Sequence, residues 1–233
     1  MSAEDWALLD DSLASVEKGA TSGQTPPSGG GSMIYAINSM DSEAIGAVGL
    51  YCVIADFQPM QSGGRISGCI KRLPSGSNTG FSPLFFMSAG GKSVNDTAYI
   101  LGLEDAEPYR IVLRKATILS GVPQAVDDNY LARSSRQYNA SAGLWHHLRL
   151  DVIEQPSGDV TLEVAKNDLA LHPCTSPVWE SIDGMAQFVD DVAAINTGSA
   201  PLIGGYVGFA AAYQQSIATR VGFDQIQILR QVP

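Results

Sequence analysis

Carboxylate pairs are the first residues in this chain whose types and spacing could do chemistry. Glycoside hydrolysis needs one carboxyl as acid and a second as nucleophile or base, a short distance apart on one face. The nearest groupings are the acidic residues of 104–107, at a predicted turn, and Asp151 with Glu154, on a predicted strand. Solvated charge explains both groupings better than catalysis does. We therefore expect no hydrolase, and no enzyme.

Histidines and serines give no stronger catalytic signal. His146 and His147 are adjacent on a predicted strand, so their side chains point to opposite faces and cannot share a metal without a third ligand nearby. His172 is isolated in the sequence. The chain has no Gly-x-Ser-x-Gly elbow and no Walker-type glycine spacing. Nucleophilic hydrolysis and nucleotide binding thus have no support.

The three cysteines, Cys52, Cys69 and Cys174, have no C-x-x-C spacing. An odd number without that spacing argues against both a disulfide framework and a zinc site. Cys52 and Cys69 lie in apolar, strand-like runs, where cysteine behaves as a small hydrophobic residue.

The elements that must position these residues follow a period of two from Met33 onward, with turn residues at short intervals. Strands are predicted over 46–57, 64–73, 83–88, 97–103, 109–119, 206–211 and 220–229. A hairpin is expected to join 148–152 to 160–164 through the turn 155–158, with Trp145 in the core and Arg149 able to lie opposite Glu163. The apolar parity shifts near Asp224, which predicts a bulge there.

Two segments depart from the strand pattern. Residues 183–195 carry apolar side chains at helical spacing (Met185, Phe188, Val192 and Ile195), which predicts a short helix over one edge. Residues 122–143 are rich in Ser, Ala, Asn and Arg and are interpreted as a long loop.

The N-terminal segment carries Trp6, Leu9, Leu13 and Val16 at spacings of three and four, which predicts one apolar face of a helix. Residues 19–32 have the composition of a flexible linker with a stiff Pro-Pro. We therefore divide the chain into a helix and linker over 1–32 and a β-sandwich over 33–233. Three alternatives stay open: the stripe docks on another protein subunit, it folds back on its own sandwich, or 28–32 is an artificial linker before a native start at Met33.

Three segments carry a family resemblance: WHHLRLDV at 145–152, GGYVGFA at 204–210 and RVGFDQIQILR at 220–230. They resemble strands of the concanavalin A-like lectin/glucanase superfamily, in particular its laminin G-like branch. The resemblance covers roughly 34–230 and implies an all-β, two-sheet antiparallel jelly-roll sandwich. Its hydrolases place carboxylates in a Glu-x-Asp-x-x-Glu signature, which this chain lacks.

The resemblance also implies where ligands would bind. Relatives often hold calcium at the sandwich rim, and the acidic pairs Asp127-Asp128 and Asp190-Asp191 are the candidate ligands, although such pairs are more often simply solvated. No cofactor is otherwise expected. Carbohydrate binding would use aromatic side chains, with Tyr130, Tyr138 and Trp179 as candidates unless they cover the core.

Charge and hydropathy exclude several partners. The net charge is −10, with 14 basic and 24 acidic residues, which disfavours nucleic acid and anionic membrane surfaces. The longest apolar run, 44–55, is short of the roughly 20 residues of a membrane-spanning helix. The N-terminus has no secretory signal pattern, so the chain is expected to be made in the cytoplasm.

Together these features predict a non-enzymatic structural or attachment protein of a larger assembly, of the kind found in a bacteriophage tail, baseplate or capsid decoration, and incorporated into the virion. This expectation rests on fold and context by analogy. The alternative is a lectin-like module that recognises a cell-surface glycan, and a third reading is a glycan-active enzyme with an unfamiliar site.

Overall fold

The computed structural model describes only part of the chain. Its described residues are 6–8, 14–18, 33–37, 47–52, 63–72, 82–88, 95–103, 110–119, 122–123, 130–135, 144–185, 187–193, 200–202, 205–212 and 220–230. None of these residues is helical, and within them no helix is long and apolar enough to cross a membrane.

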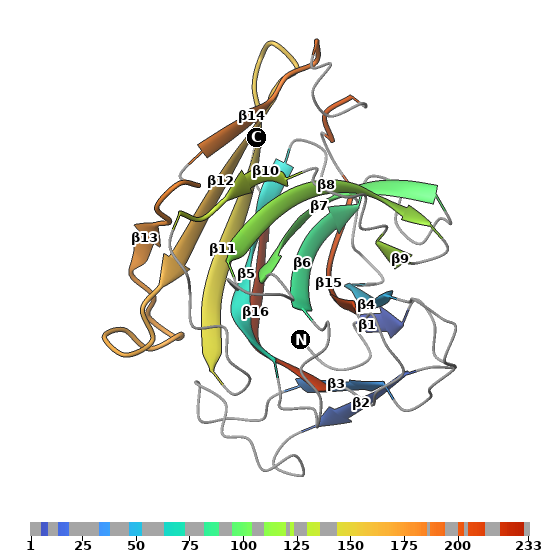
Figure 1. Cartoon of the computed structure of the whole chain (residues 1–233), viewed down its shortest axis with the longest axis vertical. Helices are drawn as coiled ribbons and strands as arrows, with labels where there is room; N and C mark the ends of the chain where they lie inside the picture. Colours follow the sequence, from blue (N-terminus) through green and yellow to red (C-terminus); the bar gives the residue numbers. More distant parts are fainter. Residues whose placement is uncertain are drawn as a thin grey trace.

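Two eight-stranded antiparallel sheets, called sheet A and sheet B here, form the two layers of the molecule (Figure 1). Sheet A runs β1 (Trp6–Leu8), β4 (Ala47–Cys52), β15 (Tyr206–Ala212), β6 (Ser82–Ser88), β7 (Asn95–Leu103), β8 (Ile111–Leu119) and β10 (Tyr130–Arg133), with β9 (Val122–Pro123) paired to β8. Sheet B runs β13 (Trp179–Ser181), β12 (Val160–Asn167), β11 (Trp145–Glu154), β5 (Gly63–Arg72), β16 (Arg220–Arg230), β3 (Met33–Ile37) and β2 (Ala14–Lys18), with β14 (Gln187–Asp190) paired to β12. The predicted all-β jelly-roll sandwich is confirmed.

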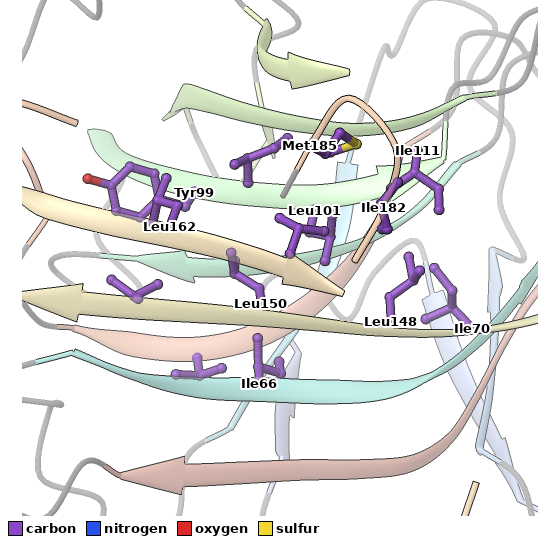
Figure 2. Close-up of a cluster of buried hydrophobic side chains, with 14 of the residues drawn as sticks. Ile66, Ile70, Tyr99, Leu101, Ile111, Leu148, Leu150, Leu162, Ile182 and Met185 are labelled. Carbon is purple, nitrogen blue, oxygen red and sulfur yellow. The ribbon is translucent and has the colours of Figure 1, made fainter. Parts of the chain in front are cut away.

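The core lies between the sheets because alternate residues of each strand point inward. The predicted hairpin is confirmed: Leu150 pairs with Val164, and Val152 with Leu162. Figure 2 shows part of the buried cluster that these side chains form with the facing strands β7 and β8. Its members include Ile66, Ile70, Tyr99, Leu101, Ile111, Leu113, Leu148, Leu150, Val152, Leu162, Val164, Val207 and Phe223.

The helix predicted over 183–195 is wrong where the structure describes that segment. The edge of sheet B is instead an interrupted strand, with β13 beside one half of β12 and β14 beside the other. Between them the chain turns at Gly184, whose φ is 85°, and Met185 N–H donates to the Ile182 carbonyl at 2.9 Å. Ile182 and Met185 are thereby inserted into the core beside Ile111 (Figure 2). Burial of apolar side chains thus decides this segment, whatever its helical spacing.

The helix predicted at the N-terminus is also wrong over the residues that are described. Residues 6–8 form β1, which pairs with β4, and residues 14–18 form β2, which pairs with β3. An isolated helix of this length is marginal in water, whereas sheet edges offer a full set of backbone partners. Leu9 and Leu13 lie outside the described residues. Docking of Trp6, Leu9, Leu13 and Val16 on another subunit stays a prediction, without its helical premise.

Two further predictions concern irregular backbone. The bulge expected near Asp224 is confirmed, since the pairing of β16 with β5 shifts between Asp224 and Gln227 and Gln225 has a φ of 50°. The long loop predicted over 122–143 is wrong in part, because it contains β9 and β10. The backbone of β10 satisfies its polar groups by pairing with β8, through a bulge after Tyr130.

Candidate functional site

The outer face of sheet B, away from the core, holds most of the buried polar side chains among the described residues. Seven of the ten such residues lie there: Ser67, Lys71, His147, Asp151, Thr161, Asn167 and Asp224. They alternate along their strands with core residues such as Leu148 and Leu150. A sheet face that buries polar groups must hydrogen-bond them, so this face has a fixed polar structure.

One row of directly paired residues crosses five strands of this face. From the edge inward it reads Trp179, Asn167, His147, Cys69 and Asp224. Directly paired residues of antiparallel strands share a face, with their Cβ atoms roughly 5 Å apart. The register therefore assembles this row from segments as distant in sequence as β5 and β16.

The Asn167 amide orders the row. Its Nδ2 donates to the carbonyl of His172 at 3.0 Å and lies 3.2 Å from Nδ1 of His147, while its Oδ1 accepts from Val178 N–H at 2.9 Å. A neutral His147 then accepts at Nδ1 and carries its proton on Nε2. Burial lowers the pKa of His147 to about 4, so the ring is neutral at physiological pH.

Trp179 packs against the ring of His147. Its ring centroid is 4.6 Å from that of His147 at an interplanar angle of 58°, and the Arg149 guanidinium carbon lies 5.3 Å from the Trp179 ring. The indole is half-buried at the edge of the sheet. We call Trp179, His147, Arg149 and Asn167 the outer-face cluster. Beside it, residues 169–174 line a hollow of about 260 Å³.

Trp145 lies on the same outer face, which corrects its prediction as a core residue. It pairs with Lys71, whose ammonium lies 5.5 Å from the Trp145 ring. A Cβ on Gly222 would come within 2.8 Å of the Trp145 ring, so glycine is what allows the indole to lie against β16. The core residues of β11 are even-numbered, beginning with Leu148. Trp145 is odd-numbered, so its side chain lies on the opposite face from the one predicted.

Asp151 is an anchor for two arginines. Its Oδ1 and Oδ2 accept from Arg65 at 2.5 and 2.9 Å, and its Oδ2 lies 3.1 Å from Arg149 Nε. The hydrogen bond to Asp151 raises the pKa of Arg65. Arg149 and Glu163 both lie on the outer face, as predicted, but they are not directly opposite each other, since Glu163 pairs with Asp151 and Arg149 with Ala165. Both carboxylate oxygens of Asp151 are thus occupied by arginine side chains.

The other predicted carboxylates do not converge. Asp151 and Glu154 are three residues apart on β11 and so face opposite ways. The acidic residues of 104–107 lie outside the described residues. His146 pairs with Ile70 and His147 with Cys69, which confirms that the two imidazoles lie on opposite faces.

The predicted calcium pair is also separated. Asp190 is fully buried, and its Oδ2 accepts from the Tyr99 hydroxyl at 2.5 Å and from Lys115 Nζ at 2.7 Å, whereas Asp191 is exposed and accepts from Ala193 N–H. The Lys115 charge already occupies the place that a cation would take. Asp127 and Asp128 lie outside the described residues, and the described ones contain no group of three or more metal-ligating side chains.

The predicted sugar-binding aromatics are split between the two sheets. Trp179 is on β13 of sheet B, and Tyr130 is on β10 of sheet A, where its hydroxyl accepts from Arg114 at 2.6 Å. The Arg133 guanidinium lies 5.0 Å from the same ring. Tyr138 lies outside the described residues. The structure thus separates Tyr130 from Trp179.

Comparison with known proteins gives matches to structures alone. No family model and no curated protein matches the sequence. The carbohydrate recognition domain of Emp47p matches 98% of this chain over 89% of its own length, at 13% identity and a TM-score of 0.52. The legume lectin-like domain from Entamoeba histolytica matches 98% over 91%, at 9% identity and a TM-score of 0.53. The carbohydrate-binding module CBM66 from Bacillus subtilis matches 97% over 95%, at 8% identity and a TM-score of 0.51.

The chain has the concanavalin A-like lectin sandwich fold. At such low identity the likeness establishes the fold of this lectin-like sandwich and leaves its ligand to be argued from its own residues. Sequence reasoning missed Asn167, Arg149 and His147 as neighbours of Trp179. The alternation of polar residues along β11 and β12 marks the face they share, but only the register brings them into one cluster.

Proposed function

We propose that this chain is a non-enzymatic, carbohydrate-binding lectin-like module and that the outer-face cluster is its sugar site. The observation that carries the proposal is the half-buried indole of Trp179, supported by His147 on a face rich in ordered polar groups. Similar solved structures are named as carbohydrate recognition and carbohydrate-binding domains, which supports the same class of ligand.

The physical basis is the amphipathic character of sugars. The C–H face of a sugar ring packs on an aromatic ring, while its hydroxyls need a few fixed donors and acceptors. Trp179 supplies the apolar surface, and Arg149 lies beside it as a cationic group, with its Nε 3.1 Å from Oδ2 of Asp151. Arg65 occupies both carboxylate oxygens of Asp151, the acidic residue nearest to this cluster on β11, which supports binding without catalysis.

The test is native affinity electrophoresis of the full chain in gels that each contain one soluble polysaccharide, neutral (mannan, β-glucan, xylan) or anionic (pectin, alginate). At least one polysaccharide should retard the protein. Trp179→Ala should then weaken the retardation at least tenfold, since a central tryptophan contributes about 2 kcal/mol or more to such interfaces.

Tyr130→Ala is the matched control, because it removes a predicted aromatic from the other sheet. Retardation lost in Tyr130→Ala and retained in Trp179→Ala would place the site on sheet A. Absence of retardation by every polysaccharide would contradict the carbohydrate-binding function itself.

The second candidate function is a structural or attachment role in a bacteriophage virion. We also propose that the chain belongs to the laminin G-like branch. These proposals are supported by the acidic composition, the linker-like run at 19–32 and the motifs at 145–152 and 204–230. In this role residues 1–18 bind another subunit, which requires that 6–8 give up their pairing with β4 and 14–18 their pairing with β3. A chain starting at Ser32 should then keep its melting temperature and lose incorporation into the particle, whereas a sharp fall in melting temperature would identify the segment as part of the sandwich, as its strand pairing indicates.

A further inference from the structure

We propose that Cys69 and Cys174 form an intramolecular disulfide that fixes the loop between β12 and β13 onto sheet B. Cys69 lies on β5 in the row that includes His147, and Cys174 lies in the loop. Both side chains are fully buried. Asn167 lies in the same row as Cys69 and holds the loop on both sides of Cys174, through the His172 carbonyl and Val178 N–H, which places Cys174 over this part of sheet B. An interaction between the two thiols, which contributes to the raised pKa of Cys69, agrees with this placement.

The loop is built to hold Cys174 in this place. Asn167 binds it at two points, the His172 carbonyl and Val178 N–H. Asp168 tightens its first turn by accepting from Ala170 N–H at its side chain and from His172 N–H at its carbonyl. Pro173 and Thr175 are exposed on either side of the buried Cys174, which is therefore the residue that the loop inserts against sheet B.

The cross-link needs an oxidant, and oxidised glutathione or another small disulfide is sufficient. When the loop opens, the Cys174 thiolate attacks one glutathione sulfur and releases one glutathione thiolate. The Cys69 thiolate then attacks the Cys174 sulfur and releases the second. Two protein thiols are oxidised, one disulfide is reduced to two glutathione molecules, and the thiol protons pass to solvent and the leaving thiolates.

Attack should begin at Cys174. Opening of the loop brings the Cys174 thiol into solvent, whereas Cys69 stays within the strand β5. Burial nevertheless raises the pKa of both thiols, so oxidation should be slow at neutral pH and faster as the pH rises. The closed loop spans about 100 residues, a length for which a cross-link restricts the unfolded chain strongly.

The experiment uses the full chain carrying Cys52→Ser, so that only the two partners remain. After incubation with oxidised glutathione at pH 8.5, intact-mass spectrometry should show the loss of two hydrogens, and alkylation in denaturant should find no free thiol. The melting temperature should rise by about 5 °C or more and return on reduction. Cys52→Ser/Cys174→Ser is the matched control and should show neither change.

Three outcomes would overturn the proposal: two alkylatable thiols after prolonged oxidation, stable glutathione adducts on both cysteines, or a cross-link between two chains. Hydrogen exchange supplies a second readout, since residues 168–178 should exchange more slowly in the oxidised protein. None of these measurements involves a glycan. Failure of the disulfide and failure of the carbohydrate site are therefore distinguished.

Discussion

The lectin-like sandwich contains two polar assemblies, one buried between the sheets and one on an outer face that is partly exposed to solvent. The inner network joins Tyr99 on β7, Lys115 on β8 and Asp190 on β14 between the sheets, where the Lys115 and Asp190 side chains are 2% and 0% exposed. The outer face of sheet B joins Asp151 to Arg65 and Arg149, and the Arg65 side chain is 38% exposed. The same ion-pair chemistry thus occurs once sealed from water and once in contact with it.

This difference in burial indicates that the inner network connects the two sheets, while the outer assembly is accessible from solvent. In the inner network, Lys115 Nζ also donates to the Ala200 carbonyl at 2.8 Å, and Leu202 N–H donates to the Tyr99 hydroxyl at 2.9 Å. These bonds tie the edge of sheet B and residues 200–202 to sheet A. On the outer face, Arg65 is partly exposed and Trp179 is half-buried, so these side chains remain in contact with solvent.

The largest expected effect tests the inner network. Asp190→Ala should lower the free energy of unfolding by about 3 to 5 kcal/mol, because it leaves the buried Lys115 charge without its partner. Asp191→Ala, at an exposed neighbour, should change it by no more than about 0.5 kcal/mol. Urea denaturation of both variants measures this, and equal costs would mean that the network is not sealed.

The next effect tests how the outer face responds to pH. Burial lowers the pKa of His147 to about 4, whereas the unfolded side chain titrates near 6.5. Between these values the unfolded chain binds the extra proton, so folding stability is lost as the pH falls from 6.5 towards 4, by roughly 2 to 3 kcal/mol.

His147→Gln should remove this part of the pH dependence, while His172→Gln should keep it. Stability is measured by urea denaturation at several pH values across the window, and each variant is compared with the parent so that carboxylate titrations cancel. An unchanged slope in His147→Gln would show that the His147 ring is open to water when folded.

The smallest expected effect comes from comparing the Asp151–Arg65 pair with the Asp190–Lys115 pair. Asp151→Asn should cost about 1 kcal/mol or less at low salt, because Arg65 is partly exposed and solvent screens the pair. The cost should fall further near 1 M salt, where the screening length is about 3 Å. The cost of Asp190→Ala should not change with salt. Equal salt dependence of the two would break the distinction between inner and outer assemblies.

Much of the strand framework could be predicted from the sequence because it depends on local patterns. The alternation of Leu148, Leu150 and Val152 identifies both the strand and its inward face, and Gly158 after a Gln-Pro-Ser turn identifies the hairpin. The parity shift near Asp224 marks the bulge. The candidate site was harder: Trp179 is visible as an aromatic residue, but nothing near it in the sequence names His147 or Arg149 as its neighbours.

The sequence by itself determined which residues alternate between the two faces of a strand, since the side-chain period of two is a property of the extended backbone. Only the tertiary structure decided which face each segment met. Spacing in 183–195 suggested a helix, yet burial of Ile182 and Met185 between the sheets made an interrupted edge strand and drew Asp190 into the core. The outer-face cluster arises in the same way, because strand register brings together Trp179, Asn167 and His147, which no local pattern relates.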